Sequence, residues 1–198
     1  MNRPKGRKPK ILLAACLVLF AFPTFLAAES PSGLSKTLYA IDVDPQDLGT
    51  LYVDTRAGIF KGAHGGREWT NLRDKDSVVS LAVASPSVLY VGTAKSGLLK
   101  STDGGGSYNR IAGGKPVTSL AIDPGSSESL WAGTDGYGLW RTSDGGGTWQ
   151  EISGIASKSV TSVAVERGIV LVGTAGHGVF RSTDAGRLWK EINTGLVD

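Results

Sequence analysis

The 198-residue chain has one cysteine, one methionine and two histidines, and these shortages exclude several kinds of chemistry. The cysteine, Cys16, lies within the first 28 residues. The remainder can therefore form no internal disulfide, thiol nucleophile or cysteine-ligated metal site. No 11-residue window shows a sustained helical period, which predicts almost no helix after residue 28. Glycine, in contrast, is abundant, with 28 residues.

Acidic residues are missing from the first 28 positions, where five of the 21 lysines and arginines lie. The sequence pI of about 9.0 therefore comes from this segment. The rest of the chain has a slight negative charge, because all 18 acidic residues lie there. Bulk charge thus gives no argument for nucleic-acid binding, and we expect no nucleic-acid partner.

Residues 1–28 have the pattern of a signal peptide. A basic head precedes an apolar run over 11–22 and small residues up to Ala28, an order typical of secretory signals. Cleavage after Ala28 would export the rest of the chain to the periplasm or out of the cell. Two alternatives keep a membrane attachment: lipidation of Cys16 in its Leu-Ala-Ala-Cys sequence, or an uncleaved anchor.

The rest of the chain consists of four repeats of about 40 residues. Each repeat holds four short runs rich in β-branched and aromatic residues, bounded by Gly, Pro, Asp or Ser, which is typical of strands. Four short strands per repeat is the pattern of a propeller blade. We predict an all-β fold, a β-propeller of four blades with four antiparallel strands each, either closed into a small ring or left as an open arc. The first runs lie at 38–43, 78–83, 117–122 and 160–165.

A linker over 29–37 should precede the propeller domain, 38–198. The first run of each repeat has the smallest side chains, which suits the crowded innermost position of a blade. A β-sandwich or a solenoid with the same strand count is the alternative. An open arc would expose apolar sheet faces, and a second copy of the chain could then complete the ring. The predicted blades cover about 38–77, 78–116, 117–159 and 160–198.

In the last three repeats a turn with the pattern Ser/Thr-x-Asp-x-Gly-x-x-aromatic joins the third and fourth runs. We expect the aspartate to accept hydrogen bonds from backbone N–H groups one or two residues further on, and the glycines to supply positive φ. A carboxylate bonded in this way is hard to protonate. The first repeat departs from the pattern, with His64 at the aspartate position. The pattern residues are Ser101, Asp103, Gly105, Tyr108, Thr142, Asp144, Gly146, Trp149, Ser182, Asp184, Gly186 and Trp189.

This turn resembles the Asp-box, or BNR, repeat, and the resemblance extends over residues 38–198. Proteins with this repeat include sialidases, sortilin-type receptors, xyloglucanase-like glycosidases and photosystem II assembly-factor-type propellers. The resemblance implies a propeller in which the box is a structural turn away from the usual ligand face. The phosphate-loop alternative lacks its Lys-Ser or Lys-Thr pair, and a calcium loop needs several carboxylates where each turn has one. We expect no cofactor and no metal.

Residues that differ between otherwise similar repeats are the best candidates for a binding site, because the fold does not require them. Such residues between the second and third runs should ring one mouth of the propeller and bind a protein or glycan partner. A solvated polar rim is the alternative. The candidates are Arg56, Lys95, Asp135, Tyr137 and His177.

The sequence favours a binding or assembly module without catalysis. A glycoside hydrolase, or a fragment of one, is the alternative, and it would need two carboxylates about 5–10 Å apart. Its weak catalytic candidates are Asp42, Asp44 and Asp123, at the ends of first runs. Asp44 and Asp123 each precede a proline, however, and such pairs are also ordinary turn starters.

Overall fold

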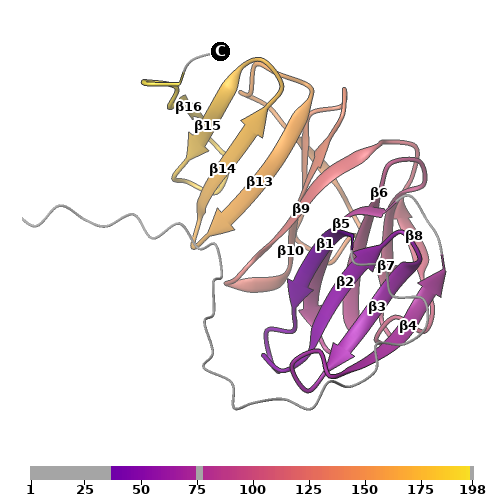
Figure 1. The fold of residues 1–198 in the computed structure, drawn as a ribbon. Helices are drawn as coiled ribbons and strands as arrows, with labels where there is room; N and C mark the ends of the chain where they lie inside the picture. Colours follow the sequence, from indigo (N-terminus) through magenta and orange to yellow (C-terminus); the bar gives the residue numbers. More distant parts are fainter. Residues whose placement is uncertain (1–36, 75–77, 197–198) are drawn as a thin grey trace, which may run out of the picture.

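The computed structural model describes residues 37–74 and 78–196, and within them sixteen strands form four sheets (Figure 1). We number the sheets as blades in chain order. Blade 1 contains β1 (Leu38–Val43), β2 (Leu51–Thr55), β3 (Gly58–Ala63) and β4 (Glu68–Asp74). Blade 2 contains β5 (Val78–Ser85), β6 (Val88–Thr93), β7 (Gly97–Ser101) and β8 (Asn109–Ala112). Blade 3 contains β9 (Val117–Asp123), β10 (Ser126–Thr134), β11 (Leu139–Thr142) and β12 (Gln150–Ile152). Blade 4 contains β13 (Val160–Glu166), β14 (Ile169–Thr174), β15 (Gly178–Ser182) and β16 (Lys190–Glu191).

Every blade is an antiparallel meander in which each strand pairs with the next one along the chain. In blade 3, for example, Trp131 of β10 lies opposite Ala121 of β9 and Arg141 of β11. The predicted all-β fold with four strands per blade is therefore confirmed. The predicted signal peptide lies outside the described residues. Within the described ranges there is no helix, and thus none suited to crossing a membrane.

The first strands of the blades line the inside of an arc. β1 packs beside β5, β5 beside β9, and β9 beside β13. Ala82 of β5 is buried at this crowded position, in agreement with the small side chains predicted for the innermost strands. At the two ends of the arc, β1 and β13 lie apart (Figure 1). Of the two arrangements left open by the sequence, the structure has the open arc.

Hydrophobic clusters fill the spaces between neighbouring blades, because the strands carry apolar residues on both faces. Tyr52 and Ile59 of blade 1 pack with Leu89 and Val91 of blade 2. Equivalent clusters join blade 2 to blade 3 and blade 3 to blade 4. Within the described residues no blade covers the outer faces of blades 1 and 4, and several of their apolar side chains are exposed. These include Tyr39, Ile41, Val43, Leu171 and Ile192.

Candidate functional site

The turns at 101–108, 142–149 and 182–189, called the aspartate turns below, share one hydrogen-bond arrangement. In blade 3 the Thr142 hydroxyl donates to Asp144 Oδ1 at 2.6 Å and accepts from the Gly146 N–H at 3.0 Å. The Thr148 N–H and hydroxyl donate to the two carboxylate oxygens of Asp144 at 2.9 and 2.7 Å. Blade 2 repeats these contacts around Asp103. Blade 4 repeats them around Asp184 except for the second hydroxyl, because Leu188 stands where blades 2 and 3 have Ser107 and Thr148. Each turn is thus closed by its own side chains.

These contacts correct the expected reach of the aspartate. The sequence predicted donors one or two residues further on, whereas Asp103 and Asp144 accept from the residue four positions later. Asp184 accepts from the N–H groups three and four positions later. The difference arises because two successive residues with positive φ, such as Gly145 and Gly146, turn the chain back towards the carboxylate. The aromatic residue does fold back, since the Trp189 indole N–H donates to the Gly186 carbonyl at 3.1 Å.

The carboxylates of the aspartate turns are held in the charged form. Hydrogen bonds from the hydroxyl and N–H of Ser107 and from the hydroxyl of Ser101 lower the pKa of Asp103 to about 2. Donors from Thr142 and Thr148 lower the pKa of Asp144 in the same way. A carboxylate whose oxygens are used to close a turn is not free to transfer protons, so we assign the aspartate turns a structural role.

The corresponding turn of blade 1 is closed by backbone instead. The N–H groups of Gly66 and Arg67 both donate to the Ala63 carbonyl at 3.0 Å. His64, at the aspartate position, has a φ of 51°. Its exposed ring lies 3.6 Å from the Glu68 carboxylate. The hydrogen bonding that the sequence left open is therefore supplied by a carbonyl, and the hairpin is kept without the carboxylate.

A groove of about 580 Å³ runs along the inner strands and is lined by residues of all four blades. Two of the three weak catalytic candidates, Asp42 and Asp123, lie on it. The third, Asp44, is buried, and its carboxylate accepts from the Gln46 N–H at 2.9 Å. The carboxylate of Asp123 accepts from the Gly125 N–H at the same distance. Asp44 and Asp123 thus act as the turn starters that their Asp-Pro pairs suggested.

Asp42 links two blades. Its two carboxylate oxygens accept from the Val43 N–H at 2.8 Å and from the Val83 N–H of blade 2 at 2.7 Å. Burial raises the pKa of Asp42, and the two backbone hydrogen bonds oppose this shift. Both oxygens are already occupied, so the geometry fits an inter-blade contact better than a general acid or base.

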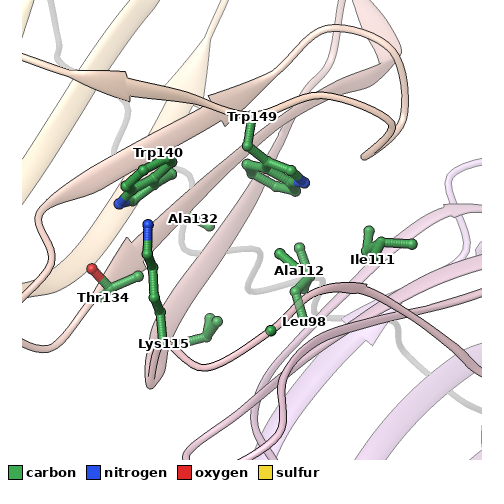
Figure 2. A pocket seen from close by; sticks show the side chains of 10 residues that line it. Leu98, Ile111, Ala112, Lys115, Ala132, Thr134, Trp140 and Trp149 are labelled. Carbon is green, nitrogen blue, oxygen red and sulfur yellow. The ribbon is translucent and has the colours of Figure 1, made fainter.

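A second hollow, of about 180 Å³, opens between blades 2 and 3 (Figure 2). Its blade 3 wall is formed by Ala132, Trp140 and Trp149. The three other blades carry valine at the position of Ala132. The smaller side chain leaves space between the blades, and we call this space the Trp pocket. Its blade 2 wall is formed by Leu98, Ile111 and Ala112.

Lys115 covers one side of the Trp pocket. It extends from the link between blades 2 and 3, and its Nζ lies 3.0 Å from the centre of the Trp140 ring (Figure 2). Burial lowers the pKa of Lys115. The Trp149 indole N–H is buried and has no hydrogen-bond partner among the described residues. The pocket therefore offers apolar walls and one cation.

Solved structures share this fold, although no family model and no curated protein sequence matches the chain. An ancestral GH74 enzyme has a TM-score of 0.65 and 22% identity, covering 78% of this chain and 24% of its own. The computationally designed Ika4 protein has a TM-score of 0.61 and 17% identity, covering 81% of this chain and 99% of its own. YCF48 from Cyanidioschyzon merolae has a TM-score of 0.58 and 19% identity, covering 82% and 57%. The fold is that of an open β-propeller. This propeller spans 24% of the ancestral GH74 enzyme, and such identities show the fold alone.

The five candidates for the rim lie in the propeller's loops between second and third strands, and all are exposed. No hydrogen bond, ion pair or ring contact within the described ranges joins any two of them. Only Asp135 and Tyr137 lie beside the Trp pocket: the Asp135 N–H donates to the Pro116 carbonyl at 3.1 Å. The Tyr137 carbonyl accepts from the Trp140 indole at 2.7 Å. Arg56, Lys95 and His177 belong to the loops of the other three blades.

Sequence reasoning missed Ala132, Trp140 and Lys115, and it gave Trp149 only a structural part. The signal for Ala132 was present, because it breaks a valine position in the aligned repeats. Lys115 had no such signal, since its contact with Trp140 depends on how blade 2 packs on blade 3. Among the described residues, no group of three His, Cys, Asp or Glu side chains is placed to hold a metal.

Proposed function

We propose that this chain is an exported Asp-box propeller that binds a protein partner without catalysis, and that the Trp pocket receives an apolar side chain of that partner. The leader pattern supports export. The three aspartate turns, with one shared hydrogen-bond arrangement, support membership of the Asp-box propellers. The observation that carries the binding proposal is the Trp pocket itself.

The size and lining of the Trp pocket favour one protein side chain over a whole small molecule. Pockets for small ligands measure about 300–1,000 Å³, whereas this one measures about 180 Å³. Its walls are mainly apolar, and burying sugar hydroxyls there without partners would cost free energy. Protein interfaces commonly depend on a few apolar or aromatic anchors seated in such pockets. Asp135, Tyr137 and Lys115 would form the polar rim around the anchor.

The carboxylates support a role without catalysis. Asp42 uses both oxygens to accept backbone N–H groups, and Asp44 is buried inside a turn. Asp123 accepts from the backbone of its own turn. A glycosidase needs one carboxyl group that can donate a proton and a second that can attack or activate water, and these residues are engaged in structure.

Selection of binding peptides from a displayed random library tests the proposal, with Ala132→Val as the decisive variant. This change restores the valine of the other blades and fills the Trp pocket. Burial of one apolar side chain contributes about 1.5–3 kcal/mol. Peptides selected on the wild-type protein should therefore share an apolar or aromatic residue and bind Ala132→Val roughly tenfold to a hundredfold more weakly. Ala175→Val, in an exposed loop of blade 4, is the matched control. Equal affinity for both variants would contradict the proposed site.

The groove along the inner strands supports a second candidate function, a glycoside hydrolase, because Asp42 and Asp123 both line it. This candidate predicts hydrolysis of at least one member of a glycan panel and loss of that activity in Asp123→Asn. Such a result would replace the proposal of a module without catalysis. Inactivity on the whole panel, together with peptide binding at the Trp pocket, would reject the hydrolase.

A further inference from the structure

Two blade interfaces, between blades 2 and 3 and between blades 3 and 4, use the same polar contacts in the same direction. In blade 2 the hydroxyl of Tyr90 and the Nζ of Lys100 both donate to the Gly145 carbonyl of blade 3, at 3.3 and 2.8 Å. The Lys100 Nζ also lies 5.3 Å from the centre of the Tyr90 ring. A second-strand aromatic residue and a third-strand cation thus hold the aspartate turn of the following blade.

Blade 3 holds blade 4 in the same way. Its Arg141 lies 5.0 Å from the Trp131 ring and donates to the Ala185 carbonyl at 3.4 Å. The Trp131 ring packs against the turn so closely that a Cβ added to Gly186 would come within 2.4 Å of it.

The inner strands repeat a second contact. The Leu120 N–H of blade 3 donates to the Ser80 hydroxyl of blade 2 at 2.9 Å. The Val163 N–H of blade 4 donates to the Ser119 hydroxyl of blade 3 at 3.1 Å. In both cases a serine on the preceding blade receives a backbone N–H from the following one.

Blade 4 carries the same groups that blades 2 and 3 use to hold the following blade, and no blade follows it among the described residues. Ser162 occupies the position of Ser80 and Ser119, and Arg181 occupies that of Lys100 and Arg141. Both are exposed. Leu171 takes the position of Trp131 and is 37% exposed, whereas Trp131 is 1% exposed. We call this surface the donor face, after the Arg181 guanidinium.

Blade 1 carries the groups that, in blades 3 and 4, receive the contacts of the preceding blade. Gly65 corresponds to Gly145, since each donates its N–H to the carbonyl of the loop beside it. A Cβ added to Gly145 would lie 2.8 Å from the Lys100 Nζ, whereas one added to Gly65 meets nothing within 4 Å. Ile41 is 61% exposed, and its equivalent Leu81 is 6% exposed. We call this surface the acceptor face, after the Gly65 carbonyl.

We propose that a second copy of this chain closes the ring, with the donor face of each copy against the acceptor face of the other. Arg181 of one copy then donates to the Gly65 carbonyl of its partner, and Ser162 accepts the Ile41 N–H. The faces complement each other and not themselves, because a donor face meeting a donor face would bring Arg181 against Arg181. Two copies give eight blades, within the usual range of four to eight for propellers. Head-to-tail contacts of this kind form a closed ring when the rotation per copy allows it.

The mass of the native protein in solution tests this proposal. The full chain is expressed, its exported form is purified, and the native mass from light scattering is compared with the mass of the denatured chain over a series of concentrations. We expect a ratio of two. Ile41→Asp removes the acceptor face and Arg181→Glu removes the donor face, so each variant alone should have a ratio of one. Lys95→Glu, in an exposed loop away from both faces, should keep the ratio at two.

Mixing the two variants distinguishes the direction of the contact. Ile41→Asp keeps its donor face and Arg181→Glu keeps its acceptor face, so an equimolar mixture should form a heterodimer through one intact interface. A wild-type ratio of one at every concentration would overturn the proposal. So would assemblies that keep growing with concentration, or dimers formed by either variant alone. If Ile41→Asp does not fold by circular dichroism, Arg181→Glu still decides, because its side chain is exposed and buries nothing within the chain.

Discussion

Asp54 is the buried group whose change should most alter how stability depends on pH. It occupies a position where the other three blades have glycine, and its side chain is 2% exposed. One carboxylate oxygen, Oδ1, is buried with no hydrogen-bond partner within the described residues. Burial raises the pKa of Asp54 to about 6 from an ordinary value of 3.8. The folded state therefore binds this proton more tightly than the unfolded state does.

The sign and size of the effect follow from this difference. Below the ordinary pKa both states are protonated, and the group has no influence on stability. As the pH rises towards 6 the unfolded state loses its proton first, so folding becomes less favourable, and the loss is complete above pH 6. The shift from 3.8 to about 6 corresponds to about 3 kcal/mol at 1.36 kcal/mol per pH unit.

The test is Asp54→Asn, compared with wild type by urea unfolding followed by tryptophan fluorescence at several pH values between 4 and 7. The free energy of unfolding of wild type, relative to the variant, should fall by about 2.4 kcal/mol across this range, because the unfolded state has already lost part of its proton at pH 4. Other titrating groups cancel in the difference. Glu128→Gln changes an exposed carboxylate and should give a constant difference. If the wild-type and Asp54→Asn profiles ran parallel between pH 4 and 7, the assigned burial cost would be wrong.

Two further changes test the turns and the blade contacts. Asp144→Ala removes the acceptor of three hydrogen bonds and should lower the melting temperature. Ser143→Ala changes the exposed neighbouring residue and should leave the melting temperature unchanged. Equal melting temperatures for the two variants would contradict the role of the carboxylate. Lys100→Ala removes a charged hydrogen bond to the Gly145 carbonyl and should lower the free energy of unfolding by about 1.5–3 kcal/mol. Lys95→Ala, in an exposed loop, should leave it unchanged, and a similar loss in both variants would refute the directional contact.

The strands could be predicted because each repeat shows its own pattern four times. Leu51, Leu89, Leu130 and Val170 occupy equivalent positions in the second strands, so a weak signal in one blade is supported by the other three. The aspartate turns were predictable for the same reason. Their hydrogen bonds were only partly foreseen, since the path of two residues with positive φ decides which N–H groups reach the carboxylate.

The site was harder to predict because it lies between repeats. Lys115 and Trp140 are 25 positions apart in the sequence, and they meet only when blade 3 packs on blade 2. Residues that break the repeat pattern were the useful signal. That signal applied equally to Ala132, which opens a pocket, and to Asp54, which buries a charge. Chemistry that depends on packing between blades has no local signature.

The one-way contacts between blades have a consequence for how the chain folds during synthesis. Blade 1 leaves the ribosome before blade 2, yet the groups that bury its Tyr52 and Ile59 belong to blade 2. In repeat proteins stability is roughly a sum of terms for each unit and for each contact between neighbours. A lone first blade has no neighbour term, so the earliest stable intermediate on the growing chain should be a pair of blades. Each later blade then adds to a surface that is already folded.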